Sequence, residues 1–139
     1  MPSYYLKNAE ETFELGRTVA KSLSPNSVLC FYGNLGAGKT TFIKGIASGM
    51  GVQQDHVNSP TFQYLNIYSG SSYSLYHFDL YRLKDSSDFI ELGFEEILTQ
   101  GGISCIEWAE RIHAIIPKQA VLISIAHRED GSRKVEISP

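Results

Sequence analysis

The sequence predicts an α/β fold with a mixed central β-sheet flanked by helices, and three observations support this. Apolar, β-prone runs alternate with segments of helical periodicity along the 139 residues. A glycine-rich segment joins one such run directly to a helix. Pairs of β-like runs separated by short polar turns predict hairpins, which would make the sheet mixed rather than purely parallel. A chain of this length with 42% hydrophobic residues is expected to form one compact domain over residues 1–139.

The N-terminal half is expected to start with a short strand at 4–6 and a helix after Asn8. Asn8 and Glu11 have the spacing of a capping box. The apolar stripe of this helix consists of Phe13, Leu15, Val19 and Leu23. Ser-Pro-Asn then ends the helix before an apolar strand at 27–32, and a second helix is expected at 41–50. These elements would place the glycine-rich segment between a buried strand and a helix.

The C-terminal half contains the remaining strands and two shorter helices. A hairpin is expected from the β-like runs at 64–68 and 74–79, and a second one from those at 121–126 and 134–137. Another apolar strand is expected at 103–107. Helical segments are expected at 85–99, interrupted by Gly93, and at 109–115, where Pro117 ends the helix.

The segment from Gly33 to Thr41 is the most informative part of the chain. It reads Gly-Asn-Leu-Gly-Ala-Gly-Lys-Thr-Thr and matches the phosphate-binding loop pattern. Its glycines permit backbone angles that turn consecutive N–H groups toward phosphate oxygens, and the positive end of the following helix adds its field. The expected nucleotide contacts are Asn34, Leu35, Gly36, Ala37, Gly38, Lys39, Thr40 and Thr41. The sequence therefore predicts a protein of the P-loop NTPase fold that binds a nucleoside triphosphate.

Hydrolysis also needs Mg²⁺ and acidic residues that organise the metal and the attacking water. The Thr40 hydroxyl is expected to ligate Mg²⁺. Glu107 and Asp79 each end an apolar strand, and Glu107 is preferred on the Mg²⁺ side because its strand is the more continuously apolar. Asp79 would then orient water, although the two roles could be exchanged.

Two further residues near the site have a functional and an ordinary interpretation. Thr61 follows a proline, and a threonine between the phosphate-loop helix and a hairpin can sense the γ-phosphate, as switch threonines do. Alternatively, Thr61 is an ordinary turn residue. Trp108, the only tryptophan, follows Glu107 and could contact the ligand or simply anchor the next helix.

Charge and cysteine content indicate the cellular compartment and the kind of partner to expect. The formal net charge is −3, so the chain is not expected to hold nucleic acid by charge alone, and a role on RNA would depend on protein partners. Cys30 and Cys105 lie in apolar runs and are expected to be reduced core residues of a cytoplasmic protein, with a disulfide between neighbouring strands as the alternative. No apolar run is long enough for a membrane helix, and the first residues lack the basic start and apolar core of a signal peptide.

Several segments together resemble one protein family. They are the phosphate-binding loop, Ser59-Pro60-Thr61-Phe62, the run His77-Phe78-Asp79-Leu80-Tyr81-Arg82-Leu83 and Ile106-Glu107-Trp108. In order and spacing they resemble the bacterial tRNA threonylcarbamoyladenosine biosynthesis ATPases of the TsaE (YjeE) family. The loop alone would not discriminate, whereas the His-Phe-Asp-Leu-Tyr-Arg and Glu-Trp segments are far more specific.

The resemblance implies a small Mg²⁺-dependent ATPase that works with two partner proteins of the TsaB and TsaD type. That complex modifies the adenosine beside the anticodon in tRNAs that read codons starting with A, and ATP hydrolysis would reset it between turnovers. The family's functional positions correspond here to Lys39, Thr40, Thr41, Asp79, Glu107 and Trp108. The resemblance also places Thr12 and Arg133 near the adenosine, with Arg128 as a competitor for Arg133. The run from His77 to Arg82 would be a docking or switch surface, or would serve packing only.

Two other functions are compatible with a phosphate-binding loop. A small nucleotide-kinase-type phosphotransferase would need an arginine-rich lid, and the chain has only Arg17, Arg82, Arg111, Arg128 and Arg133. A nucleotide-gated binding module with negligible turnover would need only the loop, with ATP setting partner affinity.

Overall fold

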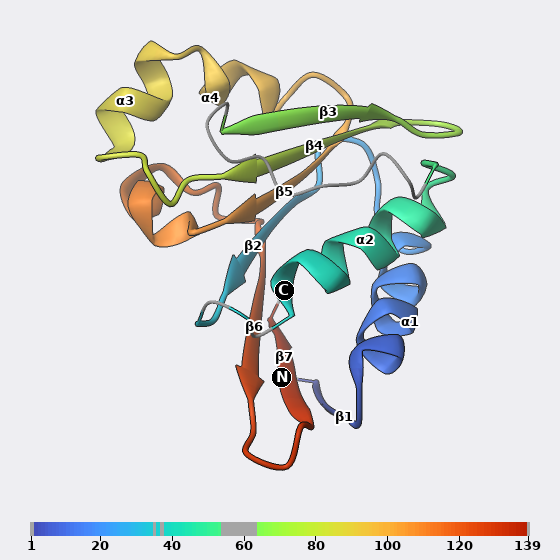
Figure 1. The fold of residues 1–139 in the computed structure, drawn as a ribbon. Coiled ribbons are helices and arrows are strands. Elements are labelled where there is room, and N and C mark those ends of the chain that lie inside the picture. Colours follow the sequence, from blue (N-terminus) through green and yellow to red (C-terminus); the bar gives the residue numbers. More distant parts are fainter. Residues whose placement is uncertain (1, 35, 37, 54–63, 139) are drawn as a thin grey trace.

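The computed structural model describes residues 2–34, 36, 38–53 and 64–138, which build a seven-stranded sheet in the order β1-β7-β6-β2-β5-β4-β3 (Figure 1). The strands are β1 (Ser3–Leu6), β2 (Val28–Tyr32), β3 (Leu65–Ser69), β4 (Ser74–Asp79), β5 (Ile103–Glu107), β6 (Val121–His127) and β7 (Arg133–Ser138). The helices are α1 (Ala9–Ala20), α2 (Lys39–Gly49), α3 (Ser86–Glu91), α4 (Phe94–Ile97) and the 3₁₀ segment η2 (Ala109–Ile115). The expected mixed α/β fold is confirmed.

The centre of the sheet is parallel and its margins are antiparallel. Strand β2 pairs in parallel with β5 and β6, and β5 also pairs in parallel with β4. Strands β3, β7 and β1 are added through antiparallel pairs, so both expected hairpins are confirmed. Strand β5 lies between β2 and β4, as its continuously apolar sequence indicated.

The helix boundaries follow from local chemistry. Asn8 caps α1 by accepting a hydrogen bond from the Glu11 N–H at 2.9 Å, and Glu11 in turn accepts from the Lys7 N–H at 2.8 Å. Helix α2 begins at Lys39 rather than at Thr41. Gly93 has a φ of 79°, which ends α3 and starts α4, so the expected interruption is confirmed. None of the helices in the described part of the chain is long and apolar enough to cross a membrane.

Two hydrophobic cores lie on opposite faces of the sheet. Helices α1 and α2 cover one face, called here the α2 face, and α3, α4 and η2 cover the other, called the α3 face (Figure 1). Side chains alternate between the faces along each central strand, so Cys105 lies in the α2-face core and Cys30 in the α3-face core. The two thiols are free, and the alternative of a disulfide between them is wrong because they lie on opposite sides of the sheet.

Glycines bring α1 and α2 into close contact. A Cβ added to Gly16 would lie 2.3 Å from the Phe42 carbonyl oxygen, and one added to Gly45 would lie 2.1 Å from that of Phe13. Backbone therefore packs directly on backbone where the two helices meet. This contact fixes the position of α2, whose first residue is the loop lysine.

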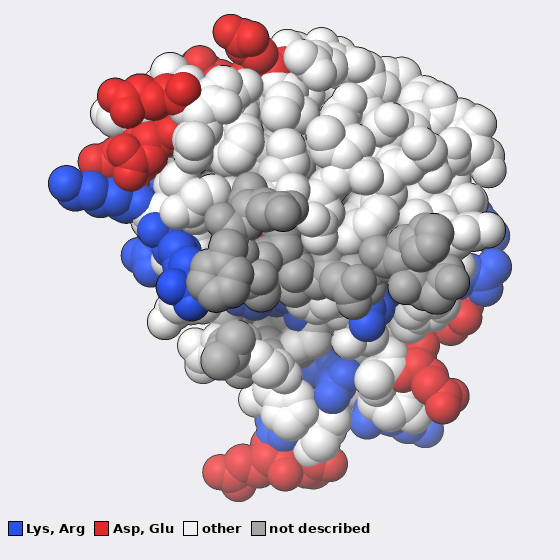
Figure 2. All heavy atoms as spheres, turned by 45° about the horizontal axis from the view of Figure 1, so that its top comes forward, with Lys and Arg blue, Asp and Glu red and all other residues white. Residues whose placement is uncertain are grey.

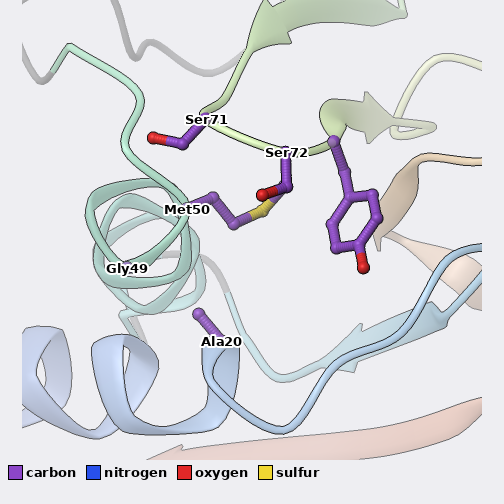
Figure 3. A pocket seen from close by; sticks show the side chains of 6 residues that line it. Ala20, Gly49, Met50, Ser71 and Ser72 are labelled. Carbon is purple, nitrogen blue, oxygen red and sulfur yellow. The ribbon is translucent and has the colours of Figure 1, made fainter.

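The far end of α2 is tied to the turn between β3 and β4. The Ser71 N–H donates to the Met50 carbonyl at 2.8 Å. A hollow of about 140 Å³ lies beside this contact (Figure 3). It is lined by Ala20, Gly49, Met50, Ser71, Ser72 and Tyr73. Its lining includes no carboxylate, amine or imidazole side chain that could bind a metal ion or a phosphate group.

Candidate functional site

The phosphate-binding loop lies between the end of β2 and the start of α2. Gly36 has a φ of 82° and Gly38 a φ of 107°, a region that residues with a Cβ rarely adopt. The first turn of α2 leaves backbone N–H groups without intrahelical partners, so this end of the helix can receive an anion. Leu35, Ala37 and Thr61 lie outside the described residues, and their expected roles stay predictions.

Lys39 lies inside the loop, with only 5% of its surface exposed. Its Nζ donates to the Gly33 carbonyl at 2.8 Å and lies 4.4 Å from the centre of the Trp108 ring. Both neighbours are uncharged. A phosphate oxyanion placed in the loop would therefore be a stronger partner for the ammonium group than either of them.

Glu107 faces the start of α2 because of strand register. In the pairing of β2, β5 and β4, Glu107 is opposite Phe31 on one side and Asp79 on the other. Its side chain points to the α2 face, where the Thr40 hydroxyl donates to the two carboxylate oxygens at 3.4 and 3.5 Å. The two residues expected to hold a metal ion, Thr40 and Glu107, are thus adjacent.

Trp108 continues from Glu107 in a left-handed conformation with a φ of 59°. Its ring packs against Tyr81 at 4.9 Å between centroids, and the Arg111 guanidinium lies 5.7 Å from its centre. Arg111 also donates to the Tyr81 carbonyl at 3.2 Å, and Asp79 accepts from the Tyr81 N–H at 3.1 Å. Tryptophan, tyrosine and arginine therefore form one wall that holds the segment after β4 against the segment after β5.

Most of the predicted site residues line one pocket of about 330 Å³. Its walls are formed by Gly36, Gly38, Lys39, Thr40, Thr41, Asp79, Glu107 and Trp108. The pocket joins residues that are far apart in sequence, because the loop and the ends of β4 and β5 all meet at the same edge of the sheet.

Thr12 and Arg133 meet on another side of the loop. The Arg133 guanidinium donates to the Thr12 hydroxyl at 3.3 Å, and Thr12 is completely buried. A Cβ added to Gly38 would lie 3.7 Å from Arg133 Nη1 and 3.8 Å from Thr12 Cγ2. The competitor Arg128 instead lies over the exposed Tyr5 ring, 5.7 Å from its centre. The structure thus places Arg133, rather than Arg128, beside the loop.

Of the two interpretations of the run from His77 to Arg82, packing rather than a docking surface fits three of its residues. His77, Phe78 and Leu80 are completely buried, because the first two belong to β4 and the third follows it into the α3-face core. Tyr81 and Arg82 are exposed.

No sequence pattern predicted that His77 or Arg111 would lie at the candidate site. His77 Nε2 lies 2.6 Å from Glu107 Oε2, and Arg111 contacts Trp108 and Tyr81. Strand periodicity could have indicated that His77 and Asp79 point to one face. The pairing of β4 with β5 could not be deduced from that periodicity.

The oxygen atoms of Thr40 and Glu107 fit Mg²⁺, which prefers hard oxygen ligands. No group of three or more His, Cys, Asp or Glu side chains that could hold a metal occurs within the described ranges. A hydroxyl and one carboxylate do not fill the coordination shell of a metal ion. They suit Mg²⁺, which usually retains waters and takes further oxygens from substrate phosphates.

Charged side chains are distributed unevenly over the surface (Figure 2). Acidic side chains gather over α3 and α4, with further acidic groups at the lower right and bottom of the view, and Lys and Arg side chains form several groups between them (Figure 2). The acidic residues in this part of the chain are Asp85, Asp88, Glu91, Glu95 and Glu96.

Comparisons with known proteins agree on one family. The family described as "Threonylcarbamoyl adenosine biosynthesis protein TsaE" matches residues 6–135. A TsaE protein of Treponema pallidum is 39% identical over 132 residues, covering 95% of this chain and 96% of that protein. One of Bacillus subtilis is 39% identical over 128 residues, covering 92% of this chain and 79% of that protein. Both are named tRNA threonylcarbamoyladenosine biosynthesis proteins.

A solved structure gives the same result for the fold. The crystal structure of YdiB from Bacillus subtilis superimposes with a TM-score of 0.80 at 32% sequence identity. The match covers 96% of this chain and 82% of that chain. Since sequence and structure agree over nearly the whole length, this chain belongs to the TsaE family.

Proposed function

We propose that this chain binds ATP with Mg²⁺ in the pocket at the start of α2 and hydrolyses it during threonylcarbamoyladenosine modification of tRNA. The observation that carries this proposal is the convergence of Lys39, Thr40 and Glu107 on one pocket at the mouth of the glycine loop. The names of the relatives supply the pathway.

The chain's own groups would bind and orient the triphosphate. Backbone N–H groups of the loop and the first turn of α2 would receive the phosphate oxygens. Lys39 would leave the Gly33 carbonyl for the β- and γ-phosphates. Thr12 and Arg133, beside Gly38, would lie toward the nucleoside, with Thr41 on the same end of α2. The loop would thereby fix the γ-phosphate at the mouth of the pocket.

Thr40 and Glu107 would hold Mg²⁺, which supplies charge neutralisation of the phosphates when bound. Asp79 lies opposite Glu107 in the strand pairing and lines the same pocket, which suits a group that orients the attacking water. Trp108, packed on Tyr81, would shield this part of the pocket from solvent.

The chain is proposed to act through protein partners of the TsaB and TsaD type rather than by holding tRNA itself. Its net charge is −3, and acidic side chains lie beside several of the cationic groups visible in Figure 2. A protein that grips nucleic acid usually offers several adjacent Lys or Arg contacts. Low intrinsic hydrolysis that the partners stimulate would agree with this arrangement.

The decisive variant is Glu107→Ala, assayed for ATP binding, phosphate release and tRNA modification in the reconstituted complex. Hydrolysis should fall by about 100-fold or more, while ATP without metal still binds. Glu110→Ala, which removes an exposed carboxylate three residues further on, is the matched control and should behave as the unaltered protein. If Glu107→Ala supports full modification, hydrolysis is dispensable and the chain is a nucleotide-gated binding module.

A further inference from the structure

A buried histidine contacts the carboxylate of Glu107 from the side of β4. His77 Nε2 lies 2.6 Å from Glu107 Oε2, and the histidine side chain is completely buried. The Thr40 hydroxyl, by comparison, is 3.4 and 3.5 Å from the two carboxylate oxygens, at the long limit for a hydrogen bond. Among the described residues, His77 therefore makes the shortest polar contact to Glu107.

The direction of this hydrogen bond follows from the chemistry of the pair. An ionised carboxylate can only accept, so the Nε2 atom of His77 must carry the proton and donate it to Oε2. The other ring nitrogen, Nδ1, is buried and has no hydrogen-bond partner within the described part of the chain. The imidazole thus directs one specific donor at one specific oxygen.

The position of His77 excludes direct contact with the ligand pocket. In the pairing of β4 with β5, His77 is opposite Cys105, two residues before the pair formed by Asp79 and Glu107. Alternation places His77 and Glu107 on the same face of the sheet. His77 does not line the pocket, whereas Asp79 and Glu107 do. His77 therefore contacts the Glu107 carboxylate from the side away from the pocket.

We propose that His77 is a positioning residue, whose Nε2–H holds the Glu107 carboxylate toward Thr40 so that both oxygen ligands face the same metal ion. This inference rests on the proposed function, because it assigns Glu107 to Mg²⁺. A glutamate side chain has several rotatable bonds, and fixing it in advance lowers the entropy that metal binding must overcome.

Three substitutions separate the hydrogen bond from packing. His77→Gln can place an amide donor near the position of Nε2, His77→Asn places one near Nδ1, and His77→Leu removes the donor at similar volume. Binding of a non-hydrolysable ATP analogue is measured in excess Mg²⁺ and in EDTA, and thermal unfolding is recorded for each variant. The gain in affinity from Mg²⁺ is the readout, because a packing role would not alter it selectively.

The gain in affinity from Mg²⁺ should fall by about 10-fold in His77→Leu and His77→Asn, and should stay within about 3-fold of the unaltered protein in His77→Gln. Affinity in EDTA should change by less than about 2-fold in all three, because the loop binds the phosphates without His77. Equal Mg²⁺ gains in all three variants and the unaltered protein would overturn the inference. So would equal losses in both conditions together with a common drop in melting temperature.

Nitrogen-15 NMR of the unaltered protein without nucleotide tests the inference independently of Mg²⁺. The His77 ring should be the Nε2-protonated tautomer, and its signals should shift in Glu107→Gln. A proton on Nδ1 alone would overturn the positioning role. If the NMR signature is present but Mg²⁺ adds nothing to nucleotide affinity, the proposed function fails while the hydrogen bond between His77 and Glu107 stands.

Discussion

The two faces of the sheet differ most sharply where β4 and β5 end. On the α2 face the strand ends carry His77, Asp79 and Glu107, and on the α3 face they carry Phe78 and Ile106. Residues that are adjacent in sequence therefore lie in different environments. Those on the α2 face are polar and lie at or beside a pocket, and those on the α3 face are packed in an apolar core. The comparison shows that one strand can line the candidate site and pack into a structural core at once, because its side chains alternate between the two faces.

The polar groups occupy only the last part of the α2 face. Further back along the same strands the α2 face is apolar, with Leu75, Ile103 and Cys105 packed under α2. On the α3 face the apolar packing continues to the end, where Phe78 contacts the rings of Phe89 and Phe94 at 5.5 and 5.4 Å. At the ends of β4 and β5, removing a side chain should therefore cost stability on the α3 face and, under the proposed function, nucleotide binding on the α2 face.

The largest effect is expected at Phe78 on the α3 face. Phe78→Ala removes a fully buried ring and should lower the free energy of unfolding by about 3–5 kcal/mol, measured by urea denaturation. Ile90→Ala, on the exposed side of α3, is the control and should cost less than about 1 kcal/mol. If nucleotide affinity of folded Phe78→Ala falls as much as its stability, the two faces are not separable.

On the α2 face, Lys39→Ala should reduce nucleotide affinity rather than stability. Nucleotide affinity should fall by about 100-fold, or about 2.7 kcal/mol, because the loop loses the cation proposed to face the phosphates. The melting temperature should not fall, since the lost ammonium is buried with uncharged partners. Lys44→Ala on the same helix is the matched control for calorimetric titration. Comparable losses in both lysine variants would contradict the assignment.

The contact between α1 and α2 offers a third comparison. Gly16→Ala would force a methyl group against the Phe42 carbonyl oxygen and should destabilise the protein by about 2 kcal/mol in thermal unfolding. Thr18→Ala, at an exposed position of α1, adds no such bulk and should be neutral. An unchanged melting temperature for Gly16→Ala would show that the helices can move apart freely.

Substitution of two arginines tests which side of the loop would face the nucleoside. Arg133→Ala should weaken ADP binding by about 10-fold, because Arg133 lies beside Gly38 and bonds Thr12. Arg128→Ala should leave the affinity unchanged, since Arg128 lies over Tyr5. The reverse order of effects in fluorescence titration would restore Arg128 as the ligand-side residue.

The smallest effect concerns the buried thiols, one on each face. Burial raises the pKa of Cys30 to about 12, and burial with a smaller contribution from Glu107 raises the pKa of Cys105 still further. Burial keeps both thiols protonated in the folded state, whereas a thiol of the unfolded chain loses its proton above its ordinary pKa of about 9. Their contribution to stability is therefore complete below pH 9 and declines as the pH rises above it.

At pH 10 the loss should be about 1 kcal/mol for each thiol relative to pH 8. Urea denaturation at the two pH values measures it, and the variant carrying Cys30→Ala with Cys105→Ala should lose that part of the alkaline destabilisation. An identical pH dependence with and without the thiols would show that other groups cause the decline.

Local features were well predicted because short-range chemistry determines them. The glycine loop, the capped start of α1 and the interruption at Gly93 each depend on residues within a few positions of one another. The apolar character of the strand at 103–107 also indicated its central place, since a strand buried on both faces must be apolar on both. Leu35, Ala37 and Thr61 remain sequence-based predictions.

The sequence by itself determined that the chain carries a strand, a phosphate-binding loop and a helix in order, and which side chains share a face of each strand. Only the tertiary structure decided that His77 lies against Glu107, that Arg133 rather than Arg128 reaches the loop, and that Phe78 and Leu80 are buried. The physical reason is that periodicity encodes the direction of a side chain, whereas strand order and register decide which distant residue it meets.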